Sequence, residues 1–258
     1  MSAAPVTYER QGRLVTITLN RPERLNAIDM ATLQALREAW QRYDEDADAW
    51  LAILAANGRA FCAGADRSWF ERALAGEDVL GVFLEATRHD RYWSGRIDKP
   101  TIVAVDGPAV GAGVDLMLRA DLRVMAEGAS LRLPEVDRGN YMLLWENLPY
   151  AVAAEMLTGA ALDAVRAHQV GLVNRLAPPG QALAVATAWA SDLLDKPPLV
   201  LRAALKALRQ IRHSHAVPSQ EVMRERATAD SRTLAASADG REAIDAFVER
   251  REPRYQAR

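Results

Sequence analysis

The chain has 258 residues, of which 50% are hydrophobic and 26% charged, and its formal net charge at pH 7 is −2. This balance is ordinary for a soluble globular protein and excludes a general attraction to nucleic acid or to an anionic membrane. Cys62 is the single cysteine, which excludes an internal disulfide and a multi-cysteine metal site. No apolar run approaches the roughly 18–20 residues that span a bilayer, and the N-terminus lacks a signal-peptide core. We therefore expect a soluble, cytoplasmic protein.

Short apolar runs flanked by Gly, Pro, Asn or Asp predict four β-strands, at 14–19, 50–56, 101–107 and 121–127. Between the first two runs, Leu33, Leu36 and Trp40 recur at helical spacing, and Asp29 stands where an N-cap belongs. These alternating elements predict an α/β core.

The later part of the chain changes character. A short helix should stop at Gly171 and be followed by a strand over 172–176. Beyond the "DKPPLV" break at 195–200 the pattern is almost entirely helical. We therefore predict a core at 1–195 and a C-terminal helical region at 196–258.

Two turns rich in small residues are the first places where chemistry can occur. In "TIVAVDGPAVGAGVDLMLRAD" (101–121) a strand runs through glycines into a helix, and free N–H groups at such a junction favour negative charge. The turn lacks the lysine of a phosphate-binding loop, and Leu116 stands where a dinucleotide motif needs its third glycine. A second such turn, "NGRAFCAGADRSW" (57–69), follows the strand at 50–56. Together they could aim two N–H groups at one oxygen, the geometry of an oxyanion hole.

Acidic residues near apolar ones raise a second question. The stretch "LPEVDRGNYMLLWENLPY" (133–150) holds Glu135, Asp137 and Glu146 among bulky apolar side chains, and an unpaired buried carboxylate is costly. From spacing alone, Glu135 is either a solvated acid paired with Arg132 or Arg138, or an acid kept inside for chemistry.

Asp115 has a similar pair of interpretations. It lies four residues before Arg119, which predicts an exposed helical ion pair, yet its helix is apolar nearly all round. Cys62 is expected to be a buried structural residue, because no histidine is near it in sequence. The "HSH" at 213–215 does not place both rings on one helix face, so we expect no metal site there.

The order and spacing of several motifs resemble the enoyl-CoA hydratase/isomerase (crotonase) superfamily over nearly the whole chain. The motifs are "TLNRPERLNA" (18–27), "GRAFCAGAD" (58–66), "KPTIVAVDGPAVGAGVDL" (99–116), "ADLRVMAEGASLRLPEV" (120–136), "MLTG" (156–159), "GLVNRL" (171–176) and "GREAIDAFVERREPRY" (240–255). The resemblance implies an α/β fold, a crotonase-like spiral of ββα turns with a C-terminal helical trimerisation region. It also implies a homotrimer, or a hexamer built as a dimer of trimers.

The resemblance further implies an acyl-CoA substrate carried as a thioester, with no metal and no tightly bound cofactor. The family's oxyanion donors fall on the backbone N–H groups of Ala65 and Ala112, and its two acids match Asp115 and Glu135. Glu135 would then be the acid kept inside, shuttling a proton between water and the α-carbon, while Asp115 would hold the attacking water. The family's coenzyme A contacts map onto Arg24, Leu25, Ala63, Asp66 and Arg67, with Phe247 and Arg250 reaching a neighbouring subunit's adenine.

Three positions depart from the family's pattern. Asp115 replaces the usual glutamate and is one methylene shorter, and a displacement of about 1 Å can cost on the order of a hundredfold in rate. Ala112 replaces the middle glycine of three, which is acceptable for a backbone donor unless its φ is positive. The segment 140–156 is several residues shorter and replaces glycines with bulky groups, so Tyr141, Trp145 and Glu146 could reshape the acyl pocket, and Glu146 could supply a replacement carboxylate.

The leading hypothesis is a lyase that hydrates an α,β-unsaturated enoyl-CoA. Double-bond isomerisation needs only one carboxylate and is the alternative within the family, together with hydrolysis or decarboxylation of a CoA thioester. A non-catalytic acyl-CoA-binding protein is the alternative from a different class. The acyl group and the choice between trimer and hexamer stay open.

Overall fold

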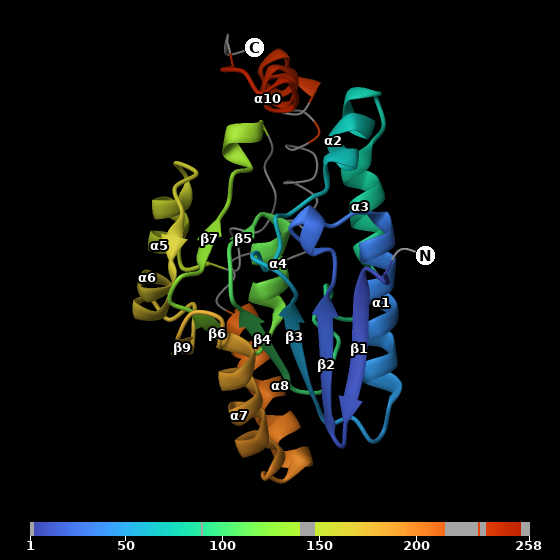
Figure 1. The fold of residues 1–258 in the computed structure, drawn as a ribbon, viewed down its shortest axis with the longest axis vertical. Helices are drawn as coiled ribbons and strands as arrows, with labels where there is room; N and C mark the ends of the chain where they lie inside the picture. The colour runs from blue at the N-terminus through green and yellow to red at the C-terminus, as the bar shows by residue number, and fades with distance from the viewer. Residues whose placement is uncertain (1–2, 89, 140–147, 215–231, 233–235, 254–258) are drawn as a thin grey trace.

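A six-stranded sheet in the order β1-β2-β3-β4-β6-β9 lies at the centre of the molecule (Figure 1). The computed structural model describes residues 3–88, 90–139, 148–214, 232 and 236–253. The strands of this sheet are β1 (Val6–Gln11), β2 (Leu14–Leu19), β3 (Leu51–Ala56), β4 (Thr101–Val105), β6 (Leu122–Ala126) and β9 (Arg175–Ala177). Strands β1 and β2 form an antiparallel hairpin, and the remaining neighbours pair in parallel. All four strands predicted from apolar runs are therefore confirmed.

Two strands differ from the sequence-based prediction. Strand β1 was not predicted, because of its six residues only Val6 is buried. The strand expected at 172–176 is wrong in position, and β9 begins three residues later. The N–H groups of Leu172 and Val173 both turn back to the carbonyl of Ala167, at 2.9 and 3.2 Å, so these two residues complete the turn after a helix. Gly171, at φ +77°, does stop that helix as predicted.

Helices surround the sheet. In chain order they are α1 (Met30–Glu45), α2 (Arg67–Leu74), α3 (Val79–Arg88), α4 (Ala112–Arg119), α5 (Tyr150–Met156), α6 (Ala164–Gln169), α7 (Ala182–Leu194), α8 (Pro198–Ser214) and α10 (Ala238–Glu249), with short 3-10 turns η1 (Pro22–Arg24) and η2 (Val136–Arg138). Asp29 caps α1 as predicted, since its carboxylate accepts from the N–H of Thr32 at 2.7 Å. The side chains on the inner face of that helix are completely buried at Leu36, Trp40 and Tyr43.

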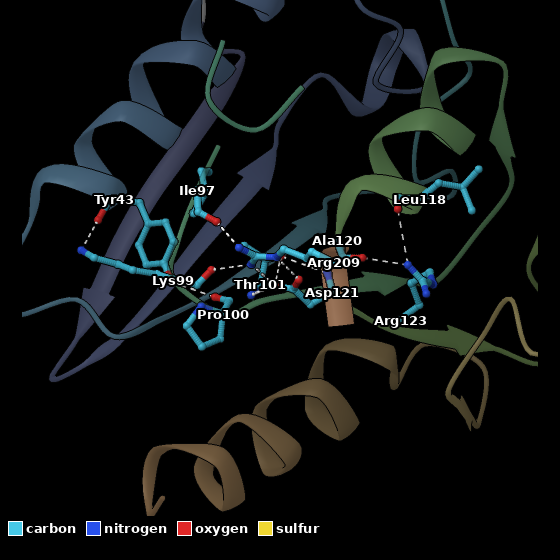
Figure 2. Close-up of polar contacts among 10 residues, drawn as sticks. All are labelled: Tyr43, Ile97, Lys99, Pro100, Thr101, Leu118, Ala120, Asp121, Arg123 and Arg209. Carbon is cyan, nitrogen blue, oxygen red and sulfur yellow. Dashed lines mark hydrogen bonds and ion pairs between the residues drawn. The ribbon is translucent and has the colours of Figure 1, made fainter. Parts of the chain in front are cut away.

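The last helices of the chain lie at two different ends of the molecule. Helix α7 places its fully buried Ala182, Ala186 and Ala190 against β3, β4, β6 and β9. Helix α8 is held by Arg209, whose guanidinium pairs with buried Asp121 at 2.7 Å and also donates to the carbonyls of Ile97 and Lys99 (Figure 2). Helix α10 lies at the opposite end, beside α2 and η2 (Figure 1). The division at residue 195 stays a prediction.

The parallel pairing of β3 with β4 brings together the two turns in which the sequence predicts chemistry. The carboxyl ends of neighbouring parallel strands open at the same edge of a sheet, so the turns that follow β3 and β4 emerge side by side. A second, three-stranded sheet of β5 (Ala109–Val110), β7 (Ser130–Arg132) and β8 (Leu162–Asp163) continues from the second turn. Across the part of the chain that is described, no helix is long and apolar enough to cross a membrane.

Candidate active site

The turn into α4 is built on three small residues, each for its own reason. Gly111 has φ +52° and ψ −116°, a conformation essentially restricted to glycine, and a Cβ there would lie 2.6 Å from Oε1 of Glu135. A Cβ on Gly113 would lie 2.5 Å from the carbonyl oxygen of Cys62. Ala112 is the first residue of α4 and is not among the described non-glycine residues with positive φ. Alanine therefore fits the middle position without strain.

Backbone hydrogen bonds hold the turn that follows β3 against the turn that leads into α4. The Val110 N–H donates to the carbonyl of Cys62 at 2.9 Å, and the Ile28 N–H donates to the carbonyl of Gly64 at 2.8 Å. A Cβ on Gly64, at φ +89°, would lie 2.8 Å from the Val110 carbonyl oxygen and 3.7 Å from the Ala112 nitrogen. The turns at 62–66 and 109–112 are therefore in direct contact.

Two backbone N–H groups of these turns have no acceptor among the described residues. The N–H groups of Asp66 and Val114 bond to neighbouring carbonyls, whereas no described residue accepts from the N–H of Ala65 or of Ala112. The Ala112 donor also lies at the N-terminus of α4, where the helix dipole adds positive potential. The predicted pair of oxyanion donors thus lies on two touching turns, and neither has an acceptor among the described residues.

Glu135 faces the same place from the turn η2. Its side chain is buried, with 7% of the residue exposed, and no described residue donates to its buried Oε2. Burial raises the pKa of this carboxyl from its ordinary value to about 7, with Asp115 and Asp137 also raising it and Arg138 lowering it. The interpretation as a solvated acid paired with an arginine is wrong, because Arg132 pairs with Asp137 instead, at 3.4 Å.

Asp115 lies on α4 behind the free N–H of Ala112. The predicted pair with Arg119 is present, with 3.0 Å between Arg119 Nε and Asp115 Oδ1. The expected exposure is wrong, since only 5% of the Asp115 side chain and 19% of the Arg119 side chain are exposed. The apolar surroundings of α4 bury the pair. No described residue donates to Asp115 Oδ2, so one oxygen of this carboxylate is left for a ligand or a water.

Leu25 and Ala63, two of the predicted coenzyme A contacts, meet directly. The Ala63 N–H donates to the Leu25 carbonyl at 3.0 Å. Leu25 and Asn26 both have positive φ, and the buried Asn26 amide holds this turn by donating to the carbonyls of Asn57 and Ala60 at 2.8 and 2.9 Å. Arg24 lies exposed at the end of η1.

The side chains of Asp66 and Arg67 are already engaged within the chain. The Asp66 carboxylate caps α2 by accepting from the Ser68 N–H at 3.1 Å and pairs with Arg21 at 3.3 Å. Arg67 forms an exposed pair with Glu71 at 2.9 Å. The Asp66 backbone is engaged as well, since its N–H donates to the Ile28 carbonyl at 2.9 Å and its carbonyl accepts from the Trp69 N–H at 3.0 Å.

Phe247 and Arg250 lie on and just after α10. The Phe247 ring, 42% exposed, contacts the Phe70 ring of α2 with 5.2 Å between ring centroids, and Arg250 ends the helix at φ +57°. Their predicted reach to a neighbouring subunit's adenine stays a prediction. The guanidinium of Arg138 lies 4.2 Å from the centroid of Phe247. Sequence reasoning missed this neighbourhood, because Phe70, Arg138 and Phe247 are far apart in the chain.

The remaining predictions concern the thiol of Cys62, a metal site and the residues outside the described part of the chain. Cys62 is fully buried, and burial raises the pKa of its thiol to about 12, which confirms the structural interpretation. The described residues contain no group of three His, Cys, Asp or Glu side chains that could hold a metal. The second histidine of the "HSH" stretch lies outside the described residues, and so do Tyr141, Trp145 and Glu146. The predictions about a metal at "HSH" and about a reshaped acyl pocket therefore stay untested.

Fold and site together define an α/β protein in which two backbone N–H groups without a described acceptor and a buried carboxyl group lie at one edge of a mostly parallel sheet. The sequence model of the enoyl-CoA hydratase/isomerase family matches residues 9–258. Enoyl-CoA hydratase EchA19 of Mycobacterium tuberculosis is 31% identical, over 100% of this chain and 98% of that protein. The 2,3-dehydroadipyl-CoA hydratase of Escherichia coli is 35% identical, over 96% of this chain and 97% of the relative. The crystal structure of carnitinyl-CoA hydratase from Mycobacterium avium superposes with a TM-score of 0.86 at 32% identity and covers 100% of both chains.

The chain belongs to the enoyl-CoA hydratase/isomerase family, within the crotonase superfamily, and is an enzyme of that family. Members of this family act on coenzyme A thioesters. The crotonase-like fold predicted from the motifs is confirmed.

Proposed function

We propose that this enzyme hydrates an α,β-unsaturated acyl-CoA. The oxygen of water bonds to the β-carbon, the double-bond electrons move toward the thioester carbonyl, and a proton is delivered to the α-carbon. Relatives named as hydratases over the full length of the chain support this choice of reaction.

The thioester oxygen gains negative charge during this reaction, and the N–H groups of Ala65 and Ala112 are the donors assigned to it. Both lack an acceptor among the described residues and come from touching turns. Donors that are held in place before the reaction need no reorganisation, and losing one typically costs about 10²–10³ in rate. The thioester itself would lie along Leu25 and Ala63, with Arg24, Asp66 and Arg67 toward the nucleotide end.

The single observation that carries the proposal is the buried carboxyl of Glu135, whose Oε2 has no donor among the described residues and whose pKa is raised to about 7. An acid–base group works best when its pKa lies near the operating pH, because both protonation states are then accessible. Glu135 would take the proton released by water and give it to the α-carbon. Oδ2 of Asp115 would hold the water, with Arg119 supplying a countercharge on Oδ1.

Double-bond isomerisation is the second candidate, and the pair between Asp115 and Arg119 favours it. Moving a proton between two carbons needs the oxyanion donors and one carboxyl group only. If Arg119 keeps the shorter Asp115 from reaching the water, Glu135 remains as that single group.

The test is turnover of straight, branched, cyclic and aryl enoyl-CoA thioesters by the wild type, Glu135→Gln and Asp115→Asn. Hydration that is reduced by at least about 10² in both variants supports a two-carboxylate hydratase. Isomerisation without hydration, lost only in Glu135→Gln, establishes the one-acid enzyme instead. Full activity of Glu135→Gln on every thioester would refute both assignments. Release of free coenzyme A or of carbon dioxide would point to thioester hydrolysis or decarboxylation.

A further inference from the structure

We infer that Arg138, held against the rings of Phe247 and Phe70, is a positioning residue that sets the charge environment of Glu135. Helix α10 thereby acts on the acid–base group of the site without touching the reacting atoms. The inference deepens the proposed function and rests on it wherever activity is the readout.

The geometry is a guanidinium that lies beside two contacting aromatic rings from different elements. The central carbon of the Arg138 guanidinium lies 4.2 Å from the centroid of Phe247 on α10 and 5.7 Å from that of Phe70 on α2. The two rings contact each other with 5.2 Å between centroids. Cations within about 6 Å of a ring are attracted to its face, so both rings hold the guanidinium in place.

No carboxylate among the described residues forms an ion pair with Arg138. The neighbouring acid Asp137 pairs with Arg132, and the carboxyl of Glu135 stays without a hydrogen-bond partner on Oε2. This arrangement affects the carboxyl group of Glu135 differently from an ordinary salt bridge. A direct pair would occupy the carboxyl of Glu135, whereas a cation held nearby by aromatic rings biases its protonation and leaves its oxygens free to react.

The charged groups that act on Glu135 come from two elements. Arg138 and Asp137 lie on the same turn η2, and Asp115 lies on α4. Both aspartates oppose ionisation of Glu135, but each is paired with an arginine, Asp137 with Arg132 and Asp115 with Arg119. Helices α2 and α10 present the rings of Phe70 and Phe247 to this turn. Arg138 is therefore the one positive charge among these three groups, and its place depends on α10.

The direction of the effect does not depend on which role Glu135 plays. A nearby positive charge favours the ionised carboxylate, so removing it makes Glu135 release its proton at higher pH. In a pH profile of kcat/KM, the limb due to Glu135 then moves to higher pH, whether the reaction requires Glu135 protonated or ionised. For a half-buried arginine we expect a move of about half a pH unit to one unit.

The experiment compares the pH profile of kcat/KM for the wild type, Arg138→Met and Arg138→Lys. Arg138→Met should shift the limb of Glu135 upward, and Arg138→Lys should restore most of its position because the charge remains. The matched control is Arg72→Met, since Arg72 also lies over a ring, 5.3 Å from the centroid of Trp69, but pairs with Glu77 and does not act on Glu135. Its profile should match the wild type.

The link to α10 is tested by Phe247→Leu. In the presence of Arg138 this change should shift the limb in the same direction, because the guanidinium is no longer held beside Glu135. In the Arg138→Met background it should add no shift. An equal shift in both backgrounds would show that Phe247 acts independently of Arg138, and the proposed link would be wrong.

A direct titration separates the inference from the proposed function. The ¹³C signal of the Glu135 carboxyl, assigned by its loss in Glu135→Gln, reports protonation without turnover. An upward shift of its midpoint in Arg138→Met supports the inference. If in addition no thioester in the panel reacts, the lack of turnover refutes the proposed function and leaves the inference standing. An unchanged midpoint in Arg138→Met would overturn the inference even if the enzyme is an active hydratase.

Discussion

Glu135 shows how the setting of one residue decides its chemistry. In sequence it is one of several acids beside arginines, and in the structure it is a buried acid whose Oε2 has no donor among the described residues. Its burial raises its pKa to about 7 and makes it costly to ionise at neutral pH. A group that suits proton transfer in this way should also weaken the fold.

This cost gives a prediction for stability against pH. Below its ordinary pKa, Glu135 is protonated in both the folded and the unfolded chain and contributes nothing. As the pH rises from about 4.5 to about 7, the unfolded chain loses this proton first, so the free energy of unfolding falls. Glu135→Gln removes the effect, and above pH 7 the variant should be more stable than the wild type by up to about 3 kcal/mol.

Urea unfolding of both proteins at pH 4.5 and pH 8 measures this difference. Other titrating groups cancel in the comparison, because Gln has nearly the same shape as Glu. A stability difference that is the same at both pH values would show that Glu135 is not held protonated by the fold.

At the scale of elements, the turn into α4 connects the Ala112 N–H group to the carboxyl group of Glu135. Gly111 places the Ala112 N–H at the start of the helix, and its own N–H donates to the Arg132 carbonyl at 2.9 Å, which ties the turn to β7 and so to Glu135. The same glycine leaves room for Oε1 of Glu135, because a Cβ would lie 2.6 Å from it. One residue thus sets the positions of both the donor and the acid.

Gly111→Ala should therefore damage the site more than the fold. The positive φ should cost about 1–2 kcal/mol in unfolding free energy, and the displaced Glu135 should lower kcat by at least about 10². Gly12→Ala is the control, because Gly12 also has positive φ, +60°, but nothing lies within 4 Å of a Cβ there. It should lose stability and keep its kcat. Equal losses of kcat in the two variants would mean that strain, and not contact with Glu135, is responsible.

At the scale of the whole molecule, the sheet is fastened to the helical region by a buried polar network. Arg209 of α8 reaches Asp121 at the start of β6 with two bonds of 2.7 Å, and Asp121 also accepts from the N–H and hydroxyl of Thr101 on β4, both at 2.9 Å (Figure 2). With 4% of its side chain exposed, Asp121 depends on these partners for its charge. Residues 88 positions apart in the chain are joined in this way.

Arg209→Met should leave this buried carboxylate without its countercharge. Removing one partner of a buried pair typically costs about 3–5 kcal/mol, so the midpoint of urea unfolding should fall strongly. Arg166→Met is the control, because its pair with Glu155 at 2.6 Å lies on the surface with side chains 45% and 42% exposed. That variant should unfold like the wild type. A small effect of Arg209→Met would show that α8 is held mainly by apolar packing.

Much of this molecule follows from local sequence patterns. The four apolar runs predict strands, Asp29 predicts the start of α1 and Gly171 the end of α6, because apolar patterning, capping and positive φ depend on residues close in sequence. Motif order is enough to recognise the family. The prediction for 172–176 is wrong because Leu172 and Val173 are apolar for a different reason, as buried residues of a turn.

The tertiary structure alone decides what the site residues can do. Spacing shows that Asp115 and Arg119 can pair, but the packing of α4 buries the pair. Likewise, sequence leaves Glu135 between solvent and interior, and sets Phe247 more than a hundred residues from Arg138. Burial, unpaired donors and ring contacts arise when distant segments meet, and they control desolvation and charge. Sequence by itself therefore determined the elements and the family of this protein, whereas three-dimensional packing decided that Glu135, the carboxyl group proposed for proton transfer, is buried and has a raised pKa.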